Sequence, residues 1–413
     1  MFPFLKIIPL MVGQLILMLF NPIFWIVVVI VAIQYRRIAG MRGEMFGSPG
    51  QKPYMDMLYA VGFGLIGGLV GSFFMVFVGV TLSGSGLIYL WPIAIFLMLV
   101  NPRFLCFAYA GGILSLSKLL LGFPDVKVSQ ILALIAILHM VESILIYFSG
   151  HLGAVPIYLR LKENGNRIVG GFTLQKFWPI PIIALIVMTG VTGGGVEMPE
   201  WWPLISPGVG DLKDVTLGLI PVVAGLGYAD IVTARTPKEK SRLSAGYLGI
   251  YSFVLLALAV MAEHSMTIAI VAALFSPLGH ELVIHIGRNI EFNAEPIYVP
   301  PGRGVKVLDI LQAGPAWKAG LRSGDVILSA SGYEVETISE LDDLLDGGYG
   351  FTELAYLRDG ERGHGKAVVP VPSASKELGM LCVPEGDTKG VVELMTGGFL
   401  SRWWDSIMAK IKG

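Results

Sequence analysis

Charged residues are scarce in this 413-residue chain, at 15% of the total, whereas soluble domains carry roughly 25%. Apolar residues make up 54% and the mean hydropathy is +0.69, so most of the chain is expected to be solvated by lipid. The net charge of −1 gives no support to nucleic acid as a partner. The scarcity of charge therefore predicts an integral membrane protein.

Cysteine is also scarce, and common catalytic signatures are missing. Cys106 lies in an apolar segment and Cys382 in a polar tail, so neither a disulfide framework nor a thiolate zinc site is suggested, and a reducing compartment fits. The soluble segments show no glycine-rich nucleotide loop and no serine-base pairing. The apolar N-terminus lacks a small-residue cleavage site and is expected to be retained. We predict no catalytic residue and no cofactor.

The stretch HELVIH at residues 280–285 comes close to the zinc motif of intramembrane proteases. In His-Glu-x-x-His the ligands lie on one helix face, whereas His280 and His285 are five apart, about 140° around a helix. No later apolar run brings an aspartate to such a site. The sequence therefore predicts no metal site, and an intramembrane metalloprotease or a protease regulator remains the alternative function.

Long apolar runs dominate the first 287 residues. About nine are long enough to cross a bilayer as helices. They cover roughly 19–35, 57–81, 87–101, 104–121, 129–150, 177–195, 214–233, 244–262 and 266–287. The shorter run at 4–18 is equally compatible with an interfacial or re-entrant helix. We predict a polytopic α-helical membrane domain over residues 1–287 with about nine spans, or eight to ten.

Basic residues are concentrated in alternate loops between these runs. One set of loops contains Arg36, Arg37, Arg42, Lys52, Arg103, Arg160, Lys162, Arg167, Lys176, Arg235, Lys238, Lys240 and Arg242. The opposite loops contain only Lys127 and Lys213. By the positive-inside rule the first set faces the cytoplasm, together with everything after residue 288. The predicted location is the plasma membrane, with a cytoplasmic C-terminus.

Small and ionisable residues within the runs suggest how the helices pack. Gly64, Gly67, Gly68 and Gly71 form small-xxx-small pairs, which predict close packing within the chain, with a homodimer face as the alternative. Ionisable groups within a membrane are costly unless they are paired or face water. Five fall in the cytoplasmic halves of their runs: His139, Glu142, Asp230, His280 and Glu281. We predict a polar cluster that fixes helix packing, with a transport or sensor site as the alternative.

The composition becomes more polar near residue 290. A strand is expected around Val305–Ile310 and a second around Val326–Leu328. Thr337 and Glu340 form a T-x-x-E capping box that opens a helix, and a hairpin is expected around residues 359–360. Residues 290–372 resemble a PDZ domain of the bacterial type. The residues most specific for it are Gly314, Pro315, Ala316, Ala319, Gly320, Leu321, Gly324, Asp325, Ile327 and Gly332.

The resemblance implies a small α+β domain, at 288–375, that binds an extended peptide at a strand edge. It makes 338–346 the groove helix, although core packing is the alternative for its leucines. Residues 284–287 or 301–304 are the candidates for the loop that receives a peptide carboxylate. The predicted peptide-binding residues are Ile284, Ile286, Gly287, Gly302, Gly304, Val305, Leu341, Leu344 and Leu345. The extension 376–413 includes a basic amphipathic helix at 399–412, which is expected to lie on the membrane or against the PDZ domain.

The whole arrangement resembles the MinJ type of Firmicutes cell-division protein. The resemblance rests on the order of domains, the segment Asn21–Phe24, the basic pair Arg36-Arg37 and the motif SPLGHE at 276–281. It implies a non-enzymatic adaptor that links a curvature-sensing polar scaffold to the division-inhibitor ATPase. The expected partners are division proteins, bound through the PDZ domain, and the lipid bilayer.

Overall fold

The computed structural model describes residues 2–47, 53–83, 86–161, 167–188, 195–208, 216–347, 350–358, 364–370, 375, 377–386 and 391–392. The helices are α1 (Phe4–Met18), α2 (Pro22–Phe46), α3 (Pro53–Val78), α4 (Leu87–Val100), the 3₁₀ turn η1 (Pro102–Leu105), α5 (Phe107–Leu121), α6 (Val128–Ser149), α7 (Pro237–Met261), α8 (Met266–Phe292), α9 (Pro315–Lys318) and α10 (Ile338–Asp346). The strands are β1 (Val155–Leu161), β2 (Arg167–Met188), β3 (Thr216–Val232), β4 (Val305–Ile310), β5 (Val326–Ala330), β6 (Tyr333–Glu334), β7 (Phe351–Leu357), β8 (His364–Pro370), β9 (Met380–Cys382) and β10 (Val391–Val392).

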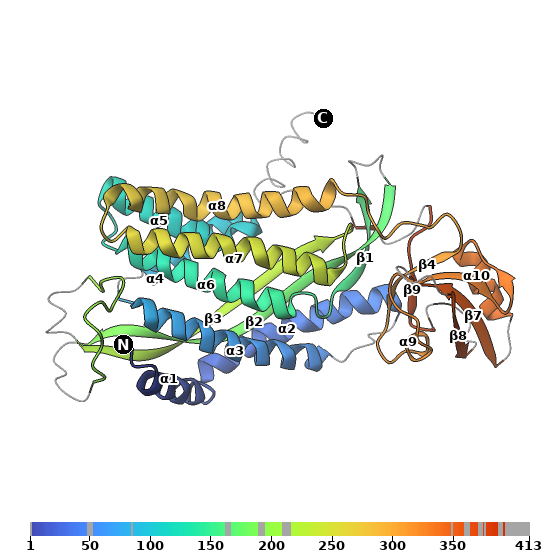
Figure 1. Cartoon of the computed structure of the whole chain (residues 1–413), viewed down its shortest axis with the longest axis horizontal. Helices are drawn as coiled ribbons and strands as arrows, with labels where there is room; N and C mark the ends of the chain where they lie inside the picture. Colours follow the sequence, from blue (N-terminus) through green and yellow to red (C-terminus); the bar gives the residue numbers. More distant parts are fainter. Residues whose placement is uncertain are drawn as a thin grey trace.

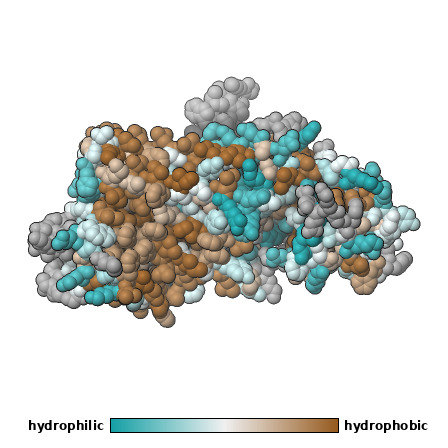
Figure 2. All heavy atoms as spheres, in the orientation of Figure 1, coloured by the Kyte–Doolittle hydropathy of each residue, from teal (hydrophilic) through white to brown (hydrophobic). Residues whose placement is uncertain are grey.

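Helices α2 to α8 run along the long axis of the molecule, and the smaller sheet domain lies at one end (Figure 1). Among the described residues, five helices are long and apolar enough to cross a membrane: α2, α3, α6, α7 and α8. Figure 2 shows an apolar surface over the helical end and a hydrophilic surface over the end with the sheet domain. This distribution is compatible with a membrane protein that carries a water-exposed domain.

The prediction of nine helical spans is wrong for four of the runs: two form strands, and those at 87–101 and 104–121 form the short helices α4 and α5, which leaves five described helices long enough to cross a membrane. The runs at 177–195 and 214–233 form a β-hairpin, in which β2 and β3 pair from Phe172↔Val232 to Met188↔Thr216. Pro179 and Pro181 are two residues apart, and each would remove a hydrogen bond and clash inside a helix. Hydropathy and run length do not distinguish a buried strand from a helix, whereas the proline spacing favours a strand.

The edge of β2 that faces away from β3 is covered by the helices. Pro179 and Pro181 fall on this edge and have no N–H to satisfy. The neighbouring edge N–H of Ile183 donates to the Ser72 hydroxyl at 2.8 Å, and that of Leu185 donates to the Val80 carbonyl at 3.3 Å. An uncovered sheet edge is not tolerated in hydrocarbon, so these contacts permit a hairpin among membrane helices.

Glycines allow α3 to approach both of its neighbours. A Cβ on Gly64 or Gly68 would clash with the backbone carbonyls of Pro179 and Pro181 in β2. A Cβ on Gly67 would lie 3.1 Å from Leu145 of α6. Both faces of the small-residue pattern are therefore occupied within the chain, which confirms the prediction of intramolecular packing over a dimer face.

Helices α1 and α2 follow one another along α3, with a break between them at residues 19–21. The start of α1 packs beside Phe73 and Phe77 at one end of α3, and Met18 at its end packs beside Leu65, halfway along α3. From there α2 begins at Pro22, with the Asn21 side chain capping its first turn, and continues toward the sheet domain. The run at 4–18 thus extends along about half the length of α3.

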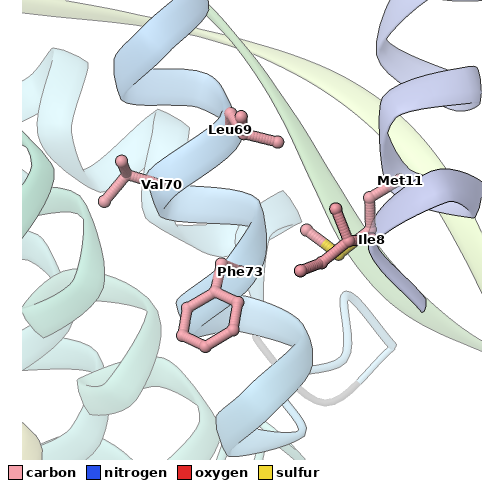
Figure 3. Close-up of a pocket in the computed structure, with 5 residues that line it drawn as sticks. All are labelled: Ile8, Met11, Leu69, Val70 and Phe73. Carbon is pink, nitrogen blue, oxygen red and sulfur yellow. The ribbon is translucent and has the colours of Figure 1, made fainter. Parts of the chain in front are cut away.

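An apolar hollow of about 230 Å³ separates α1 from α3 (Figure 3). It is lined by Ile8, Met11, Leu69, Val70 and Phe73. Because these side chains offer no hydrogen-bonding group, the hollow suits a hydrocarbon chain better than a polar ligand.

Helices α4 and α5 form a hairpin that turns within the bundle. They contain 14 and 15 residues, about 21 to 23 Å of helix, which is shorter than the roughly 30 Å of a hydrocarbon core. The turn η1 contacts α8 near its midpoint, where Arg103 forms an ion pair with Glu281. Arg103 is half-exposed in this turn and is neutralised by the Glu281 carboxylate.

The C-terminal domain has the strand order β8-β7-β5-β4-β9, and β6 pairs with β5. Its core includes Met380 and Cys382 of β9, which lie beyond residue 375, the end predicted from the sequence. It is docked on the β1–β2 hairpin, where the Gly170 N–H donates to the Tyr298 carbonyl at 2.8 Å and Tyr298 packs on Phe172. The predicted turn at 359–360 and the basic helix at 399–412 lie outside the described residues.

Candidate functional site

The peptide groove that the sequence resemblance implies would lie between the edge strand β9 and helix α10, whose residues share one core. Strand β9 pairs with β4 on one side, through the Leu311 N–H to the Gly379 carbonyl at 2.8 Å and the Val383 N–H to the Lys306 carbonyl at 2.9 Å. Because alternate residues of a strand direct their backbone groups to opposite edges, Met380 and Cys382 present theirs to the edge away from β4, where the Met380 N–H already donates to the Ser375 carbonyl at 3.2 Å. That edge is where an added peptide strand would pair.

A glycine turn leads into this edge strand. Gly379 has φ +71°, a left-handed conformation that favours glycine, and a Cβ there would lie 3.1 Å from Leu311. Leu378, Met380 and Cys382 on either side of it are buried in the domain core, together with Leu341 and Leu345 of α10. The segment Leu378-Gly379-Met380 is therefore the loop placed to receive the end of a peptide.

Sequence reasoning missed this loop. Residues 284–287, one of the two predicted receiving loops, are part of helix α8, and Gly302 and Gly304 of the other directly precede β4. Val305 belongs to the core. The apolar-glycine-apolar pattern at 378–380, followed by the apolar residues 381–383, was the available signal, but it was assigned to the extension after the domain.

The groove leucines have different roles. Leu341 and Leu345 are fully buried core residues, as the alternative interpretation had it, and Leu344 is partly buried beside them. Burial also raises the pKa of the Cys382 thiol to about 12, so this thiol is an inert core group. These side chains pack in the core between β9 and α10.

Carboxylates are concentrated along the groove. Helix α10 carries Glu340, Asp342, Asp343 and Asp346 and no basic residue. Asp342 accepts a hydrogen bond from the Ser375 N–H at 2.9 Å, just before the glycine turn. At the other end of the groove, Glu385 accepts one from the N–H of Ile338 at 3.1 Å. A peptide carboxylate would be repelled here, whereas a cationic segment would be attracted.

The membrane domain contacts the edge strand through α2 and through Tyr158 of β1. The Tyr158 hydroxyl of β1 donates to the Cys382 carbonyl at 2.9 Å, and Tyr158 is buried by this contact. The same carbonyl is one of the groups that a pairing peptide would use. Tyr158 therefore occupies part of the binding edge in this structure.

Three of the five ionisable residues predicted to cluster do lie together between the helices. His139 of α6 and His280 of α8 have ring centroids 5.1 Å apart, and Glu281 accepts a hydrogen bond from Tyr109 at 2.7 Å. The structure adds Cys106, whose sulfur is 3.1 Å from His139 Nε2 and 3.7 Å from His280 Nε2. Sequence reasoning did not include Cys106 in the cluster, because its proximity to both histidines is set only by the fold.

Asp230 does not join this cluster. It lies 3.6 Å from the ammonium of Lys240, which is fully buried and is also 3.7 Å from Glu291. Glu291 in turn accepts hydrogen bonds from the N–H groups of Thr233 and Ala234, at 2.8 and 2.7 Å. These residues join the ends of β3, α7 and α8 beside the C-terminal domain. Asp230 therefore belongs to a second polar network.

Glu142 lies one helical turn after His139 on the same face of α6. It is near enough to Cys106 and Tyr251 for electrostatic interaction. Across the part of the chain that the structure describes, its carboxylate accepts no hydrogen bond. Glu142 therefore lies beside the cluster without a polar contact of its own there.

The family comparison agrees with the geometry of the C-terminal domain. The family model of the PDZ domain matches residues 306–350. Among solved structures, the PDZ domain of the SdrC-like protein of Listeria monocytogenes is similar, with 18% identity, a TM-score of 0.17 and coverage of 20% of this chain and 90% of that one. No curated protein matches the chain. This protein therefore carries, in its C-terminal part, a PDZ domain, a peptide-binding module of protein interactions.

Proposed function

We propose that this protein is a membrane-anchored adaptor whose PDZ domain binds a segment of a partner protein at the inner face of the plasma membrane. The observation that carries the proposal is the edge strand β9, which follows the glycine turn at Leu378–Met380 and lies beside α10. The five long apolar helices supply the anchor. Arg36, Arg37 and Arg42 at the domain end of α2 favour a cytoplasmic location for that end.

The chemistry of the groove specifies the kind of segment. Asp342 already bonds the N–H of Ser375, next to the loop that would receive a terminal carboxylate. With the other acids of α10 and Glu385 nearby, an internal segment with Lys or Arg beside apolar residues is the better ligand. The partner is therefore a protein that presents an extended, basic, internal stretch.

The role in placing the division site rests on the resemblance to the MinJ type. An adaptor of that type would need a fixed anchor and an exchangeable grip on a soluble partner, and the PDZ edge strand supplies such a grip. Division proteins are accordingly the proposed partners, and the protein is proposed to act without making or breaking covalent bonds.

Binding can be tested with full-length protein in nanodiscs and a short fluorescent peptide of alternating basic and apolar residues. We expect the amidated peptide to bind at least as well as the same peptide with a free carboxylate. Asp342→Lys should weaken binding roughly tenfold, whereas Asp343→Lys, the same charge change at an exposed neighbouring position, should have a smaller effect. Binding only of the free-carboxylate form, or equal effects of the two variants, would contradict the proposed specificity.

The orientation has a separate test. The test introduces Ser331→Cys, at an exposed position, into a chain in which Cys106 and Cys382 are replaced by serine. The new cysteine should be protected from a membrane-impermeant maleimide in intact cells. Labelling should appear after the cells are opened. Labelling in intact cells would place the PDZ domain outside and refute the adaptor.

A further inference from the structure

We propose that Cys106, His139 and His280 form a binding site for a transition-metal ion, with Zn²⁺ as the expected metal. Their ligand atoms all lie within 4.8 Å of one another. A zinc ion at tetrahedral angles, with bonds of about 2.3 Å to sulfur and about 2.05 Å to nitrogen, separates sulfur from nitrogen by about 3.6 Å. The observed separations of 3.1 and 3.7 Å lie on either side of that value.

Both imidazoles are oriented as metal ligands. The Nδ1 atom of His139 lies 2.8 Å from the Ile135 carbonyl, which can only accept, so Nδ1 carries the proton and Nε2 has a free lone pair. The Nδ1 atom of His280 lies 3.4 Å from the Tyr109 hydroxyl, which itself donates to Glu281 at 2.7 Å. Nδ1 of His280 is therefore also the donor, and both Nε2 lone pairs point to Cys106.

This arrangement leaves two acceptors facing one thiol. A thiol has a single proton and can satisfy only one of the two Nε2 atoms, whereas a metal ion satisfies both nitrogens and the thiolate together. The sulfur of Cys106 also caps the first turn of α5 and lies 3.4 Å from the N–H of Ala108. A backbone N–H and the positive end of a helix both favour a thiolate at this position.

The surroundings resemble the outer shell of a metal centre. The relay from His280 through Tyr109 to Glu281, with Arg103 bound to that carboxylate, fixes the ring orientation. Tyr251 of α7 packs against both imidazoles, with ring centroids 5.5 and 5.7 Å away. The ligands therefore come from three helices that are held in place independently of any metal.

Charge balance identifies a fourth group. A divalent ion with one thiolate and two neutral imidazoles has a net charge of +1, which is costly in a membrane interior. Glu142 is the nearby carboxylate on the His139 face of α6, and it balances this charge directly or through a bound water. Three protein ligands with one further position is a common pattern for zinc.

The metal would join the turn of the α4–α5 hairpin to α6 and α8. Cys106 directly follows η1, so binding would hold the hairpin at mid-depth, and α8 continues to the PDZ domain. The histidine pair of the HELVIH stretch is not the site, because His285 lies elsewhere on α8, 2.8 Å from the side chain of Asn289.

The first test is the metal content of the full-length protein, purified in detergent without chelator from zinc-sufficient medium. We expect about one zinc ion per chain for the wild type, and loss of that zinc in Cys106→Ser and His280→Ala. Two matched controls should keep it: Cys382→Ser, the other cysteine, and His285→Ala, on the same helix. Equal zinc in wild type and Cys106→Ser, or no zinc in the wild type, would overturn the proposal, as would loss of zinc in both controls.

A second test does not depend on the survival of a ligand variant. Tyr109→Phe keeps all three ligands and removes only the relay, so zinc affinity should fall roughly 10- to 100-fold. Cobalt added to metal-free wild type should give a thiolate-to-cobalt charge-transfer band, which Tyr109→Phe retains and Cys106→Ser lacks. Cobalt spectra without a thiolate band in the wild type would mean adventitious binding only, and would refute the site.

Discussion

Replacing Gly68 by alanine tests whether the helix–hairpin contact defines the membrane domain. The added Cβ would clash with the Pro181 carbonyl, which belongs to the backbone of β2. That backbone is held by its ladder to β3 and by the Ser72 hydroxyl, so it has little freedom to move away. Overpacking of this kind costs about 1 to 3 kcal/mol, and the upper end applies to a fixed backbone.

Gly62→Ala in the same helix is the matched control, because a Cβ there meets nothing within 4 Å. Both substitutions gain about 1 kcal/mol of helix propensity. The net effect is therefore about 2 kcal/mol of destabilisation for Gly68→Ala and about 1 kcal/mol of stabilisation for Gly62→Ala. The difference of about 3 kcal/mol corresponds to on the order of 3 to 4 °C in melting temperature for a chain of 413 residues.

The assay is thermal unfolding of the purified full-length protein in detergent, followed by tryptophan fluorescence and by the fraction that remains monodisperse after heating. Trp178 of β2 is fully buried and reports on the hairpin. Equal melting temperatures for Gly68→Ala and Gly62→Ala would refute the close approach of α3 to β2.

Three further predictions concern the domain junction. Burial raises the pKa of Asp309 to about 6, so the wild type should lose up to roughly 3 kcal/mol of stability as the pH rises from about 4 to about 6. Asp309→Asn should therefore melt at a higher temperature than wild type at neutral pH and at the same temperature at about pH 4. A difference in melting temperature that does not depend on pH would contradict this prediction. Lys240→Met should cost about 1 to 3 kcal/mol in thermal unfolding, because it leaves Glu291 with the partly exposed Arg235, 3.6 Å away, in place of a buried ammonium, whereas Lys238→Met at an exposed position should cost little. Tyr158→Phe removes a donor to the Cys382 carbonyl and should tighten peptide binding in nanodiscs roughly fivefold; unchanged or weaker binding would show that Tyr158 does not compete.

Much of the fold could be predicted from the sequence, because local signals were strong. The capping box at Thr337, the glycines of α3 and most of the apolar helices were recognised from patterns that reflect local physics. The β2–β3 hairpin was not, since hydropathy measures only the transfer of side chains to lipid, and the edge of β2 is satisfied by residues remote in sequence such as Ser72.

The candidate sites show the same division. His139, His280 and Glu281 were singled out by the cost of ionisable groups among apolar residues. The meeting of Cys106 with both histidines depends on a hairpin that turns at mid-depth, and helix length alone does not specify that depth. The edge strand β9 was missed because a strand of three residues carries almost no periodicity.

The covered edge of β2 also constrains the order in which the protein is assembled. Tyr35, Ser72 and Val80 meet the outer edge of β2, and all three precede it in the chain. Each exposed backbone group costs several kcal/mol in hydrocarbon, so this hairpin has no stable place in the bilayer until α2 and α3 are there to receive it. Synthesis from the N-terminus supplies those helices first. A circular permutation that placed them after the hairpin would leave the outer edge of β2 without its hydrogen-bond partners during biogenesis.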